Sequence, residues 1–111
     1  MPDEGYDTVH AAYVAILDRH PEASEKGKKN RYTSLNGHMS SFLSPAGELC
    51  IRLSADDMQA FHKEYPGDPV MQYGAVMKGY VELPQSLWRD TDAALDWFNK
   101  SWTYVGGLKP K

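Results

Sequence analysis

The chain lacks several features that would assign it to a specialised class. It has one cysteine, Cys50, in 111 residues, so no disulfide can form within it, and we expect a cytoplasmic location. The net charge of −3 gives no strong field toward nucleic acid or a membrane surface. No apolar run approaches the roughly 20 residues that cross a bilayer. The start of the chain has no basic segment followed by an apolar one, so we expect no signal peptide.

What is present is typical of one globular domain. Hydrophobic residues make up 41% of the chain and charged residues 24%, which are ordinary values for such a domain. A chain of 111 residues can bury a real core without disulfides or metals. We therefore expect a single domain over residues 1–111.

Apolar residues recur at helical spacing in three segments. This spacing predicts helices over residues 6–19, 55–65 and 90–106. Ser54 precedes the second helix as a favourable N-cap, and Asp57 follows at capping-box spacing. Phe98 and Trp102 lie on the apolar stripe of the last helix and are expected to be buried, as is Phe61 in the second.

Alternating residues and turn signals predict strands between these helices. The expected strands cover residues 31–35, 38–43, 48–53, 70–73 and 77–83. Asn36-Gly37 is the favoured two-residue hairpin turn. Leu49, Ile51 and Leu53 share one strand face and are expected in the core. Pro84 should end the last strand, because it has no N–H to donate.

The predicted order is α-β-β-β-α-β-β-α. Runs of strands between helices favour an α+β fold with helices on one face of a mainly antiparallel sheet. We predict a two-layer domain with a five-stranded sheet and three helices.

The chain resembles the amino-terminal domain of TfoX-type proteins, a family named for a bacterial competence regulator. The residues that carry the resemblance are Asn36-Gly37-His38-Met39, Leu49 to Leu53, Val76-Met77-Lys78-Gly79-Tyr80-Val81, Ser101-Trp102-Thr103-Tyr104-Val105 and Leu108-Lys109-Pro110-Lys111. The resemblance runs from about residue 26 to the end. It implies a single-domain member with a two-layer α+β fold similar to that of secretion chaperones, a regulatory function, and no catalytic residues to carry over.

The last helix and its flank are rich in large aromatic residues. Trp88, Trp97 and Tyr104 lie outside the core stripe that contains Trp102. Such a surface favours self-association or a protein partner. An equally good interpretation is a helix with a wide apolar face packed on its own sheet.

A basic cluster precedes the first strand and consists of Lys26, Lys28, Lys29 and Arg31. It could bind nucleic acid weakly through phosphate contacts. A solvated loop is the favoured interpretation, because the chain is net acidic and carries no nucleic-acid-binding motif.

The histidines and the cysteine do not form a recognisable site. No two of His10, His20, His38 and His62 have the close spacing of zinc ligands, so we expect no metal and no cofactor. Cys50 lies mid-strand with no evident base, and an inert thiol is favoured. An enzyme using His38, His62 or Cys50 is therefore the least favoured alternative. We expect a non-enzymatic binding or regulatory domain that acts through protein contacts, either as a homodimer or with another protein.

Overall fold

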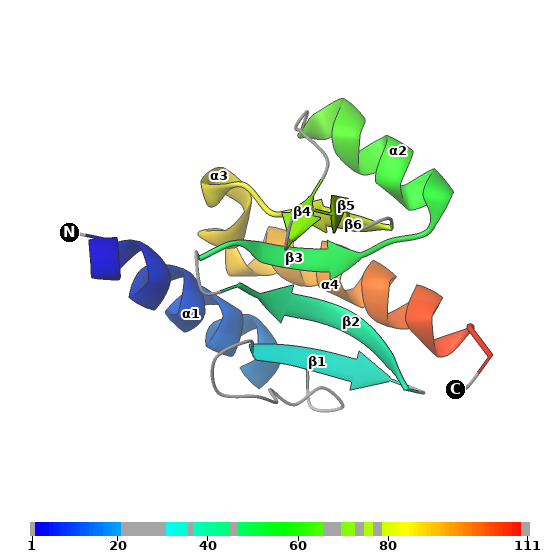
Figure 1. Ribbon diagram of the computed structural model, residues 1–111, viewed down its shortest axis with the longest axis horizontal. Helices are drawn as coiled ribbons and strands as arrows, with labels where there is room; N and C mark the ends of the chain where they lie inside the picture. The colour runs from blue at the N-terminus through cyan, green and yellow to red at the C-terminus, as the bar shows by residue number, and fades with distance from the viewer. Residues whose placement is uncertain are drawn as a thin grey trace.

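The computed structural model describes residues 2–20, 31–35, 37–44, 47–65, 70–72, 75–76 and 79–109. They form an α+β fold in which a four-stranded antiparallel sheet packs against helices (Figure 1). The elements in chain order are α1 (Pro2–Asp18), β1 (Arg31–Leu35), β2 (His38–Leu43), β3 (Leu49–Arg52), α2 (Ala55–Glu64), β4 (Met71–Gln72), β5 (Ala75–Val76), β6 (Tyr80–Glu82), α3 (Gln85–Trp88) and α4 (Thr91–Gly106).

The main sheet has the order β1-β2-β3-β6 and is antiparallel throughout. The predicted hairpin between β1 and β2 is confirmed: Leu35 pairs with His38, and Gly37 has a φ of 83°. Asn36 itself lies outside the described residues. Positive φ at Gly37 is what a tight hairpin turn requires, and glycine adopts it without a steric cost.

One irregularity in β2 changes the direction of its side chains. Thr33 pairs with Ser41, but the next residue, Ser34, pairs with Met39, so Ser40 is an extra residue in the ladder. A β-bulge of this kind breaks the strict alternation of side chains. As a result, both Ser40 and Ser41 are buried, at 1% and 0% exposure.

Helices α2 and α4 begin and end within one residue of the predicted positions, whereas α1 begins at Pro2, four residues before its predicted start. Ser54 caps α2, because its hydroxyl accepts a hydrogen bond from the Asp57 N–H at 3.2 Å. Asp90 caps α4 in the same way by accepting from the Ala93 N–H at 3.2 Å. These side chains satisfy backbone donors that the first turn of a helix leaves free.

The main core lies between the sheet and the helices. Figure 1 shows α4 running along the sheet with α1 beside it. Leu49, Ile51 and Leu53 contribute to this core as predicted, with exposures of 2% or less. Phe61 and Phe98 are also buried as predicted, at 1% and 2%. The prediction that Trp102 is buried is only partly right, because this side chain is half-buried and packs at the edge of the core.

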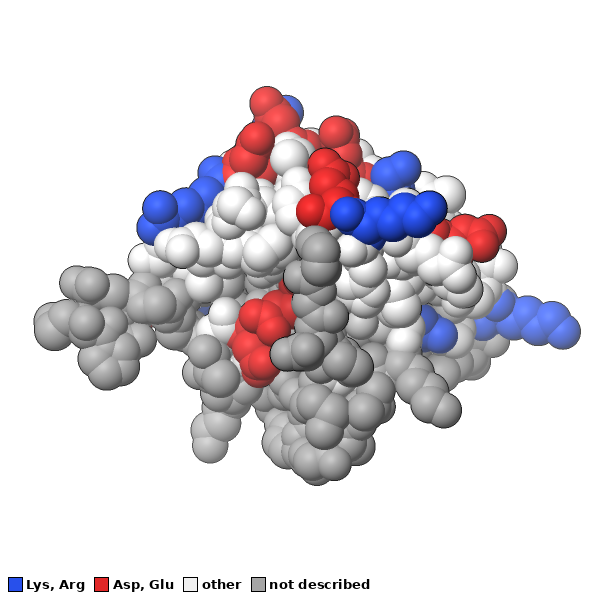
Figure 2. Space-filling model, turned by 90° about the horizontal axis from the view of Figure 1, so that it is seen from above, with Lys and Arg blue, Asp and Glu red and all other residues white. Residues whose placement is uncertain are grey.

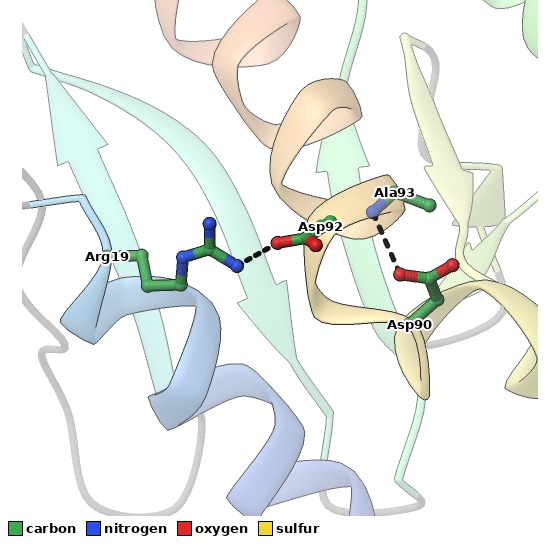
Figure 3. A network of polar contacts seen from close by, with 4 residues as sticks. All are labelled: Arg19, Asp90, Asp92 and Ala93. Carbon is green, nitrogen blue, oxygen red and sulfur yellow. Dashed lines mark hydrogen bonds and ion pairs between the residues drawn. The ribbon is translucent and has the colours of Figure 1, made fainter.

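Helices α1 and α4 are also tied together at the surface. The Arg19 guanidinium, just beyond α1, forms an ion pair with the Asp92 carboxylate in the first turn of α4 (Figure 3). Both side chains are well exposed, so solvent screens this pair and its contribution to stability is small.

The opposite face of the sheet has a smaller apolar cluster. Phe42, Cys50 and Val70 are buried there, with Tyr80 packed against them. The rings of Phe42 and Tyr80 meet edge to face, with centroids 5.5 Å apart. The prediction that Cys50 lies opposite the Leu49 face is confirmed.

The predicted five-stranded sheet is wrong in one respect. The predicted strand 70–73 becomes β4, which pairs with β5 to form a separate two-stranded sheet. Ala75 and Val76, which lie between the two strands predicted in this part of the chain, form β5. Residue patterns show that a segment is extended, but they do not determine which strand it pairs with.

The predicted count of three helices is also wrong, because there is a fourth, α3. Pro84 ends the preceding strand as expected, and it also takes the N-cap position of α3. A helix of four residues is too short to show an apolar period in sequence.

Within the described ranges, no helix is long and apolar enough to cross a membrane.

Candidate functional site

The three aromatic residues predicted as an interface are half-buried. Trp88 ends α3, while Trp97 and Tyr104 lie on α4. The Trp97 ring meets the Phe61 ring of α2 edge to face, with centroids 5.1 Å apart. Trp97 therefore joins α2 to α4 at the edge of the core, and only part of its surface remains for another molecule.

Each of these aromatic rings has a cationic side chain over it. Arg89 lies 5.8 Å from the Trp88 centroid, Lys100 lies 5.7 Å from that of Trp97, and Arg52 lies 6.0 Å from that of Tyr104. Cations are attracted to the negative faces of aromatic rings. The outward surface of the predicted interface is thus a mixture of ring edges and positive charge.

A groove lies between the start of α2 and the C-terminal half of α4. Its volume is about 440 Å³, and its lining residues are Ser54, Asp57, Asn99, Lys100, Thr103 and Tyr104. The hollow is shallow and largely open to solvent, so it differs from the enclosing pockets that bury most of a small ligand. The groove therefore places Tyr104, one of the predicted interface residues, among hydrogen-bonding and charged groups.

The local sequence explains this arrangement. Residues four positions apart on a helix lie one turn above each other, so Asn99 with Thr103 and Lys100 with Tyr104 form two adjacent rows that make one wall. The facing wall is the capped first turn of α2, which follows directly from β3. The wall on α4 can be read from the sequence, but the pairing of the two walls depends on the fold.

The two walls carry opposite charges. Asp57 lies on the α2 wall next to the exposed Asp56, and Lys100 lies on the α4 wall. Among the described residues, Arg19 pairs with Asp92 at the start of α4, and neither Asp57 nor Lys100 takes part in that ion pair. Both residues line the groove, and the Lys100 ammonium also lies 5.7 Å from the centroid of the Trp97 ring.

Arg52 supports the Tyr104 side of the groove from the sheet. Arg52 pairs with Tyr80 across β3 and β6, and the Tyr80 hydroxyl donates to the Met39 carbonyl oxygen at 2.7 Å. Burial raises the pKa of Tyr80, and the nearby Arg52 charge opposes this shift.

Gly79, just before β6, has a φ of 86°, so this turn needs a residue that tolerates the left-handed region.

The basic cluster is described at one position. Lys26, Lys28 and Lys29 lie outside the described residues, and Arg31 begins β1 with its side chain half-buried. Figure 2 shows acidic and basic side chains interspersed on the face of the molecule that it draws. Weak nucleic-acid binding by this cluster stays a hypothesis.

The histidines lie in separate places. His38 Nε2 is 2.7 Å from the Lys109 carbonyl oxygen and donates to it, because a carbonyl oxygen only accepts. The His20 ring packs edge to face against Phe98 and Trp102, with centroids 5.2 and 5.0 Å away. Among the described residues, no three histidine, cysteine or acidic side chains come together as metal ligands do.

Cys50 has the properties of a structural cysteine. Its side chain is fully buried, and burial strongly raises the pKa of the thiol; the charges of Glu82 and Glu48 raise it further. The thiolate is the reactive form of cysteine, so this environment suppresses nucleophilic chemistry.

A buried hydroxyl network is the polar feature that the sequence did not reveal. Thr33 Oγ1 lies 2.6 Å from Ser40 Oγ and 2.5 Å from Ser41 Oγ, and Ser41 Oγ lies 2.8 Å from the Tyr13 hydroxyl. Ser101 Oγ donates to the Ser40 carbonyl oxygen at 3.1 Å. The network joins α1, β1, β2 and α4, and these described hydrogen bonds involve side-chain hydroxyls and one main-chain carbonyl. In the sequence, β2 shows two adjacent serines, and this pair does not by itself predict a bulge.

Comparison with known protein families finds no family model that matches this chain, and comparison with curated proteins finds no significant match.

Proposed function

We propose that this protein is a non-enzymatic binding domain that acts through protein contacts at the groove between α2 and α4. The observation that carries the proposal is the groove itself, where Tyr104 lies beside charged and hydrogen-bonding side chains of two helices. Tyrosine buries a large area at little entropic cost, and it is enriched among residues that dominate binding energy.

The placement of the reactive residue types supports a binding role over catalysis. Cys50 is buried with a raised pKa, and His38 is engaged by the main chain near the C-terminal end. His20 is packed between aromatic rings. In the described ranges, these groups lie apart from one another and from the groove, whereas catalysis requires a nucleophile, a base and a site for the substrate within reach of one another.

The resemblance to the TfoX amino-terminal domain fits the same proposal. It implies a regulatory role for a single domain of this type. The α+β architecture is compatible with that role but does not establish it, since one fold serves many functions.

Site-specific photo-crosslinking tests the proposal. A photoreactive amino acid is placed at Thr103, an exposed residue of the groove, and as a control at Ala11, an exposed residue of α1. After irradiation in cells, crosslinked proteins are identified by mass spectrometry. We expect a discrete protein adduct, either with a second copy or with another protein, from position 103 and not from position 11.

Two results would contradict the proposal. One is no protein adduct from position 103 under conditions where the probe is incorporated and the domain is folded. The other is the same set of adducts from both positions, which would indicate random collisions.

A further inference from the structure

The groove separates acidic and basic groups onto opposite walls. Asp57, with Asp56 beside it, lies on the α2 wall, and Lys100 lies on the α4 wall near Arg52 and Tyr104. Asp96 is one turn from Lys100 but does not line the groove. An acidic wall and a basic wall that face one hollow can complement the same two walls of an identical molecule.

We infer that a second copy of this chain binds at the groove, so that the α2 wall of each copy contacts the α4 wall of the other. A twofold axis makes every contact occur twice, because the same patch of both molecules is used. Asp57 of each copy then lies against Lys100 of the other. This inference rests on the proposed function and names the partner.

The charges that line the groove favour a second copy of this chain over a ligand whose charges are all positive or all negative. A strongly acidic or strongly basic ligand would meet a like charge on one of the walls. A second copy presents a positive wall to the negative one and a negative wall to the positive one. In the described part of the chain, neither Asp57 nor Lys100 has an ion-pair partner. The Lys100 ammonium lies over the Trp97 ring, and this contact leaves its charge unneutralised for a carboxylate of the second copy.

The polar neighbours suit a contact between two folded surfaces. Asn99, Thr103 and Ser54 offer an amide and two hydroxyls along the groove, and Tyr104 offers an aromatic ring supported by Arg52. Protein interfaces are enriched in tyrosine and arginine near their centres, with polar groups around them. The basic cluster at residues 26–31 is not needed for this contact.

Charge reversal tests the inference by sedimentation velocity across a wide concentration range. We expect the wild type to dimerise, and Lys100→Glu or Asp57→Lys to weaken dimerisation by about tenfold or more, because each change creates two repulsive contacts. Lys63→Glu and Asp7→Lys serve as matched controls, since both residues are exposed and lie outside the groove. The controls should dimerise like the wild type.

Mixing the two variants gives the decisive result. In a mixed dimer of the Lys100→Glu and Asp57→Lys variants, one contact pairs two original charges and the other pairs two reversed ones. The mixture should therefore associate at concentrations where each variant alone is monomeric, and high salt should reverse this. Circular dichroism confirms that each variant is folded.

Two outcomes would overturn the inference. A wild type that stays monomeric at every concentration excludes a second copy, although a groove adduct with another protein would still support the proposed function. Variants that dimerise like the wild type, or a mixture that does not associate, would show that these walls do not meet.

Discussion

Thr33 connects the buried hydroxyl network, because its side chain is within hydrogen-bond distance of both Ser40 and Ser41. Replacing it by valine keeps the shape but leaves two buried hydroxyls without this partner. We expect Thr33→Val to lower the free energy of unfolding by about 1–3 kcal/mol, measured by chemical denaturation. Thr8→Val, at an exposed position of α1, should change it by less than about 0.5 kcal/mol. Equal effects at both positions would show that the network contributes little.

Glu82 provides a pH-dependent test at the residue scale. Partial burial of its carboxyl group raises its pKa above the ordinary value of 4.5, and the Glu48 charge raises it further. Ionisation of this group therefore destabilises the folded state. The penalty is absent below the unfolded pKa, grows as pH rises through the folded pKa, and is complete above it.

Glu82→Gln should consequently raise the melting temperature at pH 7 and have a smaller effect at pH 4. The gain in the free energy of unfolding at pH 7 should stay below about 1 kcal/mol, because the carboxyl group is only partly buried, the residue as a whole is exposed, and solvent screens its charge. In a Glu48→Gln background the gain should shrink, since one cause of the shift has been removed. A gain of the same size at both pH values would assign it to something other than ionisation.

At the scale of single elements, the capping of α2 can be measured directly. Ser54→Ala removes the acceptor for the Asp57 N–H, and we expect a loss of about 1 kcal/mol in the free energy of unfolding. Ser54→Asp should retain most of the stability, because a carboxylate also caps helix N-termini. A loss of the same size in both variants would show that the cap hydrogen bond is not its cause.

The packing of α4 on the sheet depends on Phe98. This side chain is 2% exposed within the main core, so Phe98→Ala removes a ring and leaves a cavity. We expect a loss of about 3–5 kcal/mol by chemical denaturation. The neighbouring Asn99 is exposed, and Asn99→Ala should change stability by less than about 0.5 kcal/mol. A loss below about 1 kcal/mol for Phe98→Ala would contradict its core position.

At the scale of the whole molecule, folding should not depend on a metal ion. The histidine spacing gives no zinc motif, and the described residues bring no three candidate ligands together. Dialysis against a chelator should leave the melting temperature unchanged within about 1 °C, whereas removal of a structural metal unfolds small domains. A clear decrease, restored by zinc, would reveal a site that includes residues outside the described ranges.

The sequence by itself determined the local structure of this protein. Ser54 and Asp90 fixed the starts of α2 and α4, because a capping side chain acts on the backbone within its own turn. The glycine at position 37 fixed the β1–β2 hairpin, and the alternation from Leu49 to Leu53 identified the core face of β3. These interactions join residues close together in the chain, so the sequence displays them.

Only the tertiary structure decided which distant segments meet. The pairing of β4 with β5, and not with the main sheet, depends on hydrogen bonds between backbone groups that are the same in every residue. The bulge at Ser40 gathers hydroxyls from four elements, and the groove joins the start of α2 to the end of α4. Trp97 is half-buried because Phe61 lies against it, although its own helix leaves it at the edge of the core. In each case the neighbour comes from far along the chain, and no local pattern records it.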